Sequence, residues 1–122
     1  MTDLLKRIIY EDDAILVLDK PSGLIVNRSS TTKENTLQDF LIDYLGISAP
    51  SEGISPLSND PRDVFLLRSG MAHRLDKDTS GVVLIAKTPE SLQSLMRQFK
   101  NREVQKTYIA LVHGKIDDRV ID

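Results

Sequence analysis

Residues 73–81 read HRLDKDTSG, and residues 82–86, VVLIA, follow them directly. The first stretch places an imidazole, a guanidinium, two carboxylates, two hydroxyls and a glycine side by side. The second is a short apolar run rich in β-branched residues, which predicts a buried strand. A dense polar loop that leads into a core strand is a common place for a rigid scaffold to display chemistry. This stretch therefore predicts both a strand of the central sheet and the functional site.

The segments around this stretch predict strands and helices that alternate along the chain. Residues 8–10 and 14–19 are rich in β-forming side chains and flank three acids, which predicts a hairpin. A helix is expected to begin at Asn35 or Thr36, and a second at Thr88 and Pro89, because these residues cap helices or begin their first turn. Their apolar residues recur at helical spacing and should face the core: Leu37, Phe40, Leu41, Tyr44 and Leu45 in the first, and Leu92, Leu95, Met96 and Phe99 in the second.

Two further segments complete the pattern. Residues 106–112 alternate in the manner of a strand that carries Tyr108. Residues 46–63 are rich in Ser, Pro, Gly, Asn and Asp, so they predict one long loop, either a lid over a ligand or, more simply, a variable insertion. Together the elements predict an α/β or α+β layer arrangement in a single domain.

Three motifs in this order resemble a known family. Residues 73–81 match the pattern H-R-L-D-x-x-T-S-G, residues 18–24 (LDKPSGL) contain K-P-x-G after a hairpin, and residues 106–114 (KTYIALVHG) form a tyrosine-bearing strand. The chain is similar in all three to the RluA-type pseudouridine synthases, and most of all to the large-ribosomal-subunit enzymes. The resemblance implies an α+β fold, in which a central mixed, largely antiparallel sheet is flanked by helices.

The resemblance also implies a function. Enzymes of this family isomerise uridine to pseudouridine in rRNA or tRNA, and their aspartate nucleophile corresponds to Asp76. Arg74 is expected to enter the RNA and hold the base out of the stack, and Tyr108 to stack on the uracil with its hydroxyl near C5. Attack on uracil C6 and attack on the ribose C1′ both remain open. The reaction implies neither a metal nor an organic cofactor.

Part of the family's pattern is missing from this chain. No segment similar to G-R-T-H-Q-I-R follows residue 114, and only seven residues precede Ile8, which leaves no room for an S4 RNA-binding domain. We therefore expect residues 1–122 to form a C-terminally truncated, partial catalytic domain that is weakly active or inactive alone and self-associates through an exposed sheet edge. The alternative is a non-catalytic RNA-binding remnant of such an enzyme.

The distribution of charge favours RNA contact in the second half. Residues 1–66 hold 6 Lys and Arg against 11 Asp and Glu, whereas residues 67–122 hold 10 against 7, within a net charge of −2. Phosphate recognition needs only a local basic face. Arg74, Arg97, Lys100 and Arg102 are the candidate RNA-binding residues. On sequence alone, the cations at residues 97–106 could equally be the solvated face of a helix and its exit.

Other functional classes fit the sequence poorly. There is no cysteine, and no apolar run approaches the ~20 residues that cross a membrane, so the expected location is the cytoplasm. His73, Asp76 and Asp78 are too few for a metal site, because the chain has only one other histidine, His113. Residues 79–83 do not fit the nucleophile elbow of a serine hydrolase. Lys20, Pro21 and Gly23 are expected to brace the loop that carries Asp76.

Overall fold

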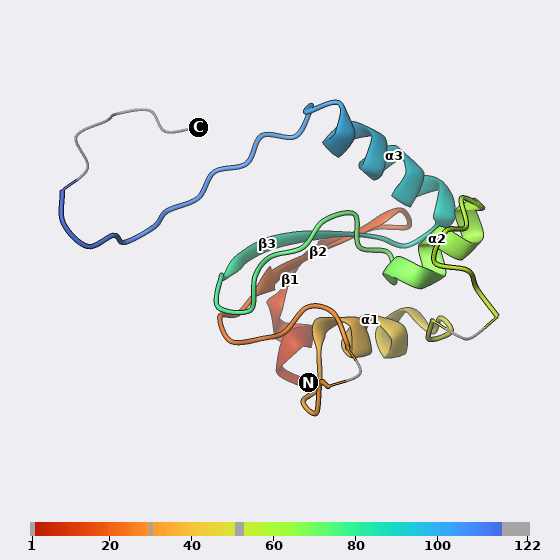
Figure 1. Ribbon diagram of the computed structural model, residues 1–122, viewed down its shortest axis with the longest axis horizontal. Coiled ribbons are helices and arrows are strands. Elements are labelled where there is room, and N and C mark those ends of the chain that lie inside the picture. The colour runs from red at the N-terminus through yellow and green to blue at the C-terminus, as the bar shows by residue number, and fades with distance from the viewer. Residues whose placement is uncertain (1, 30, 51–52, 116–122) are drawn as a thin grey trace.

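The computed structural model describes residues 2–29, 31–50 and 53–115. They form a small α+β unit from which the last described residues extend away (Figure 1). Its elements in chain order are the 3₁₀ helix η1 (Thr2–Arg7), strands β1 (Ile8–Glu11) and β2 (Ile15–Lys20), helices α1 (Leu37–Leu45) and α2 (Pro61–Arg68), strand β3 (Gly81–Ala86) and helix α3 (Pro89–Lys100).

The sheet has the order β1-β2-β3, and each neighbouring pair is antiparallel. The hairpin, the strand after the signature loop and the α+β class are therefore confirmed. In the register of β2 and β3, Leu16 lies opposite Ile85 and Leu18 opposite Val83. These four side chains are fully buried, as expected for the inward face of a strand pair on which every second residue points to the core.

Helix α1 covers this buried face of the sheet (Figure 1). Thr36 is its N-cap, as predicted, and its hydroxyl accepts a hydrogen bond from the Asp39 amide. The Asp39 carboxylate accepts in return from the Thr36 amide, which completes a capping box. Leu37, Phe40 and Leu41 then pack against the strands, with Leu45 partly buried beside them. Tyr44, which was also expected to face the core, is exposed, and its hydroxyl donates to the Glu11 carboxylate.

Helices α2 and α3 enclose a second, smaller cluster around Phe65, Ala86 and Leu92. Helix α3 begins at Pro89 after the Thr88 cap, as predicted. Helix α2 was missed, and the predicted loop of residues 46–63 ends three residues early, at Asp60. The Asp60 carboxylate accepts from the amides of Arg62 and Asp63, and Pro61 occupies the first turn, where its missing N–H costs nothing. The proline that suggested a loop in fact begins a helix.

The segment of residues 104–115, here called the tail, does not contain the predicted strand at residues 106–112. It leaves α3 and runs outward from the body, and the side chains of Ile109 and Leu111 are fully exposed (Figure 1). Alternation in a sequence supplies the period of a strand but no partner for its backbone, and a strand is stable only beside another. Within the described residues the tail joins no sheet, and it therefore lacks the hydrogen bonds of a strand.

Candidate active site

The loop of residues 73–81 is held by a buried lysine at the end of β2. Lys20 is fully buried on the core face, in register with Gly81. Its ammonium donates to the carbonyls of Lys77 and Thr79, both at 2.8 Å, and to that of Pro21 at 3.1 Å. Burial lowers the pKa of Lys20, and the fields of Asp78 and Asp76 oppose that shift. Each of the three ammonium protons has a carbonyl acceptor inside the protein.

The residues that follow Lys20 add two more ties to the same loop. The Gly23 amide donates to the Lys77 carbonyl at 2.8 Å, and the Ser22 hydroxyl donates to the Asp78 carbonyl at 2.8 Å. Gly23 has a φ of +92°, a conformation that favours glycine. The prediction that residues around Pro21 brace the loop is confirmed, and the carbonyls of residues 77–79 are where they act.

On the N-terminal side of these ties, the loop exposes two of its predicted functional side chains. Leu75 is buried in the core, whereas Arg74 and Asp76 on either side of it are exposed. The Asp76 carbonyl accepts from the Thr79 amide at 3.0 Å and closes a tight turn. The Asp76 carboxylate is therefore displayed to solvent from a backbone that is fixed on its C-terminal side by Lys20 and on its N-terminal side by Leu75.

A cavity of about 810 Å³ lies beside the loop. It is lined by the loop and start of β3 (His73, Leu75, Asp78, Thr79, Ser80, Gly81, Val82, Leu84), by Phe99 of α3, and by the tail (Val104, Gln105, Lys106, Thr107, Tyr108, Ile109). Tyr108 and the signature loop thus share one cavity, as the predicted site requires. Asp76 and Arg74 are not among its lining residues, so the structure brings only part of the predicted catalytic set together.

Sequence reasoning missed three residues of this cavity. The rings of His73 and Phe99 stack at 4.7 Å between centroids, and the Lys106 ammonium lies 5.4 Å from the centre of the Phe99 ring. The sequence did mark Phe99, as part of a helical apolar stripe, and His73, as the first residue of the signature. Nothing in the sequence indicated that these two side chains would contact each other. Lys106 adds a positive charge next to Tyr108, as a phosphate-binding wall would need.

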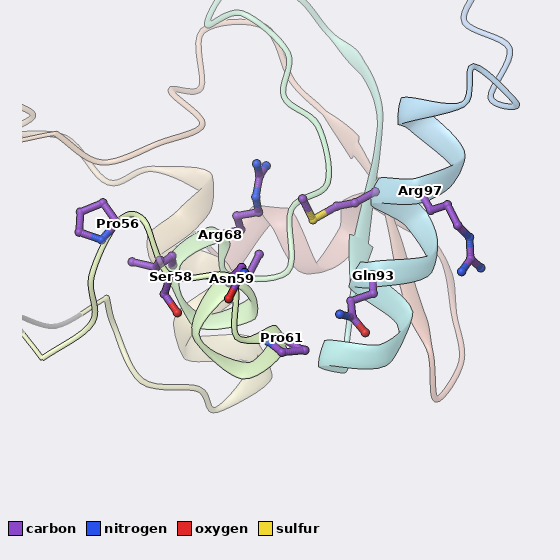
Figure 2. Close-up of a pocket in the computed structure, with 10 residues that line it drawn as sticks. Pro56, Ser58, Asn59, Pro61, Arg68, Gln93 and Arg97 are labelled. Atoms are coloured by element: carbon purple, nitrogen blue, oxygen red, sulfur yellow. The ribbon is translucent and has the colours of Figure 1, made fainter.

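A second cavity, of about 820 Å³, lies between α2 and α3. Figure 2 shows Pro61 of α2 facing Gln93 of α3 across it, with Arg68 above and the Arg97 side chain directed away from α2. Arg97, a predicted RNA-binding residue, therefore lies at this cavity and not at the one that Tyr108 lines. Arg68, which sequence reasoning did not select, lines it as well.

The remaining predicted cations are exposed and not gathered into one site. Lys100 is the last residue of α3, and Arg102 follows in the left-handed conformation, with a φ of 58°. Both lie where the chain leaves the helix toward the tail. A positive charge near the C-terminus of a helix is stabilised by the helix dipole. This structural role accounts for Lys100 as readily as RNA contact does.

Neither a metal cluster nor a membrane span is found in the part of the chain that the structure describes. Over residues 2–29, 31–50 and 53–115, no three His, Asp or Glu side chains lie close enough to share an ion. Over the same ranges, no helix is both long and apolar enough to cross a bilayer.

The hairpin, the braced loop and the tyrosine-bearing tail hold the three motifs that resemble the pseudouridine synthases. The sequence of the chain matches the model of the RNA pseudouridylate synthase family over residues 14–121, and the chain belongs to that family. It is 39% identical over 117 residues to ribosomal large subunit pseudouridine synthase D of Nitrosomonas europaea. It is 37% identical over 119 residues to ribosomal large subunit pseudouridine synthase C of Buchnera aphidicola subsp. Acyrthosiphon pisum.

These alignments cover 95% and 98% of this chain but only 30% and 32% of the two relatives. The chain therefore spans about a third of the length of the curated relatives it matches. Among solved structures, human RNA Pseudouridylate Synthase Domain Containing 4 matches with a TM-score of 0.54 and 22% identity, over 84% of this chain and 32% of that one. This likeness supports the fold, which the sequence resemblance had implied.

Proposed function

We propose that this chain is the nucleophile-bearing part of an enzyme that isomerises uridine to pseudouridine in RNA, with Asp76 as the nucleophile. The observation that carries the proposal is the exposed Asp76 carboxylate on a loop whose backbone is tied to a fully buried lysine. A nucleophile acts best when the surrounding structure fixes it before the substrate arrives. Membership of the family supports the reaction class.

The chemistry requires the C1′–N1 bond to break, the base to turn, and C5 to join C1′. A carboxylate is ionised at neutral pH and can attack carbon at uracil C6 or at ribose C1′. The target base has to leave the helical stack before it can be reached. Arg74, exposed beside Asp76, suits insertion into the space that the base leaves. Tyr108 offers a ring for stacking and a hydroxyl for proton removal at C5.

Substituting the nucleophile tests the proposal. In any active form of this protein, Asp76→Asn should abolish tritium release from RNA that contains 5-tritiated uridine, because an amide cannot replace an anionic nucleophile. Asp43→Asn, an exposed acid on α1, is the control and should keep the parent rate. Turnover near the parent rate in Asp76→Asn would remove that residue from the role. RNA that contains 5-fluorouridine separates the alternative function, since a non-catalytic remnant would bind it without forming a covalent adduct.

A second variant tests the tyrosine. Tyr108→Phe should leave the affinity for RNA within about twofold while sharply slowing the chemical step, because stacking needs the ring and proton removal needs the hydroxyl. If affinity falls as far as the rate does, Tyr108 is a binding residue only.

The RNA class is proposed to be rRNA, with tRNA as the second candidate. The support is that several relatives are named ribosomal large subunit pseudouridine synthases. Assays on large-subunit rRNA transcripts and on tRNA transcripts, followed by mass spectrometry of the digests, distinguish the two. Modification of tRNA alone would contradict the first choice.

The RNA-binding face is proposed to lie in the second half of the chain, at Arg74, Arg97, Lys100 and Arg102. Affinity should fall with added salt, and neutralising these residues should reduce the dependence on salt. The matched set is Lys6, Arg7 and Lys33, three exposed cations of the acidic half. Equal losses from both sets would count against a basic face in the second half.

Self-association is proposed for residues 1–122, through an exposed edge of the sheet and the tail. The support is the exposure of Val82 at the start of β3 and of Tyr108, Ile109 and Leu111 in the tail. Sedimentation velocity over a hundredfold range of concentration tests it. A single monomeric species throughout would overturn it.

A further inference from the structure

The segment just before the signature loop runs along the outer edge of β3. The Ala86 amide donates to the Gly70 carbonyl at 2.7 Å, and Met71 pairs with Ile85 in an antiparallel bridge. If this register continued, Leu84 would lie opposite Ala72 and donate to its carbonyl. The Leu84 amide donates to Nε2 of His73 instead, at 3.0 Å. A side chain thus takes the place of a strand backbone at this edge.

The imidazole that accepts this hydrogen bond also packs against an aromatic ring. It stacks on Phe99 at an interplanar angle of 28°, and the Lys106 ammonium lies over the same phenyl ring. The titratable side chains that line the cavity with His73 are Asp78 of the loop and Lys106 and Tyr108 of the tail. From β3 and α3 the cavity receives Val82, Leu84 and Phe99, none of which titrates.

We propose that His73 is a positioning residue for Asp76, acting as a neutral imidazole that is protonated at Nδ1 and ties the start of the loop to β3. Lys20 holds the carbonyls of Lys77 and Thr79, and His73 holds the other end, three residues before Asp76. Asp76 then lies between two hydrogen-bonded anchors, and the buried Leu75 side chain holds the residue before it. The role in catalysis rests on the proposed function, whereas the anchor itself can be tested without turnover.

The geometry fixes the protonation state. A nitrogen that accepts a hydrogen bond from an amide cannot also carry a proton, so protonation at Nε2 would break the tie to Leu84. Burial lowers the pKa of His73, and the charge of Lys106 lowers it further. The unfolded chain binds the proton more readily, so the anchor contributes in full above the ordinary pKa of 6.5 and is lost as the pH falls below it.

Nuclear magnetic resonance of the uniformly ¹⁵N-labelled full chain tests the proposal. At pH 7, Nε2 of His73 should show the chemical shift of an unprotonated acceptor. The Leu84 and Asp76 amide signals should move with the midpoint of the His73 ring as the pH is lowered. Titration of the His73 ring at or above the ordinary pKa of 6.5, or amide signals that do not move with that titration, would overturn the proposal.

Two variants separate anchoring from packing. His73→Gln places an amide oxygen near the position of Nε2, so the Leu84 amide should stay protected from hydrogen exchange relative to its intrinsic rate, and this protection should no longer depend on pH. His73→Leu fills the space without an acceptor, and Leu84 exchange should accelerate at least tenfold. Equal exchange in the two variants would overturn the proposal. If His73→Leu fails to fold, the titration of the parent and His73→Gln still decide.

Discussion

Two of the three motif-bearing segments of this chain, residues 73–81 and the tail, differ in what holds them. Residues 73–81 are tied to β2 through Lys20, to the hairpin exit through Ser22 and Gly23, and to β3 through His73. The tail, which carries Tyr108, leaves the body after α3 (Figure 1). Its Lys106 ammonium lies 5.4 Å from the centre of the Phe99 ring. Both segments match the family, yet only the first has its geometry fixed by contacts within the described residues.

The difference teaches which kind of motif a short chain can organise. A loop is fixed by hydrogen bonds to its own carbonyls, and one lysine satisfies three carbonyls at once. A strand is fixed by a neighbouring strand along its whole length. Asp76 is therefore displayed in a defined position, whereas Tyr108 is 62% exposed and outside any strand.

The largest effect is expected at Lys20, the β2 residue to which residues 73–81 are tied. Lys20→Met should destabilise the fold by about 3–5 kcal/mol, because it leaves three partly buried carbonyls without the charged donor that they share. Urea unfolding measures the change. Lys33→Met, at an exposed position, is the matched control and should stay within about 0.5 kcal/mol of the parent. A loss at Lys20 no larger than at Lys33 would remove the lysine anchor from the comparison.

A smaller effect is expected at Gly70, where the residues before the signature loop first contact the end of β3. Gly70 has a φ of +80°, and a Cβ there would lie 2.2 Å from the Ala86 carbonyl oxygen. Gly70→Ala should therefore destabilise by about 2–4 kcal/mol, from strain together with displacement of the backbone.

Gly46→Ala isolates the contribution of the backbone conformation. Gly46 has a φ of +65°, but an alanine methyl at this position would meet nothing within 4 Å, so about 1 kcal/mol is expected there. Thermal unfolding of both variants makes the test. Equal losses would mean that the close approach of Gly70 to β3 has no energetic weight.

Much of the folded body, residues 2–100, could be predicted from the sequence because its signals are local. The alternation of β2, the Thr36 and Thr88 caps, and the apolar stripe of α3 each depend on residues within one or two turns. Lys20 was expected to brace the loop, but its three carbonyl acceptors were not predictable, since two of them lie 57 and 59 residues away.

The errors have a physical origin too. Helix α2 was hidden because Pro61 reads as a loop residue unless Asp60 is recognised as its cap. The tail alternates like a strand, yet the sequence pattern contains no information about a partner. The pairing of His73 with Leu84 was not foreseen, because it depends on the register of residues 70–73 along β3. Elements that depend on neighbouring residues were predicted, whereas contacts between residues far apart in the sequence were not.

An intermediate effect is expected at a third tie of the body, between α1 and the loop before it. The Arg28 guanidinium donates to both oxygens of Asp39, and this pairing, with the Thr36 hydrogen bonds, lowers the pKa of Asp39 from 3.8 to about 2. A carboxyl whose pKa is depressed on folding stabilises the protein above its unfolded value and loses that contribution as the pH falls toward the folded value.

Asp39→Asn should therefore cost about 1–2 kcal/mol at pH 7, reduced from the full linkage value because Arg28 is partly exposed. The gap between parent and variant should close as the pH is lowered from about 4 to about 2. Urea unfolding at several pH values measures it, with Asp43→Asn of the same helix as control. A gap that does not change with pH would show that the capping geometry, and not the charge of Asp39, supplies the stability.

The smallest effect is expected in the tail. Leu111 is fully exposed, so Leu111→Ala removes no buried contact and should change the free energy of unfolding by less than about 0.5 kcal/mol. Leu18→Ala is the matched change in the body, where the same side chain is fully buried, and it should cost about 2–5 kcal/mol. Both are measured by urea unfolding at a protein concentration low enough to keep the chain monomeric. If Leu111→Ala costs as much as Leu18→Ala, the tail is packed in solution, and Tyr108 is then held in place as firmly as Asp76.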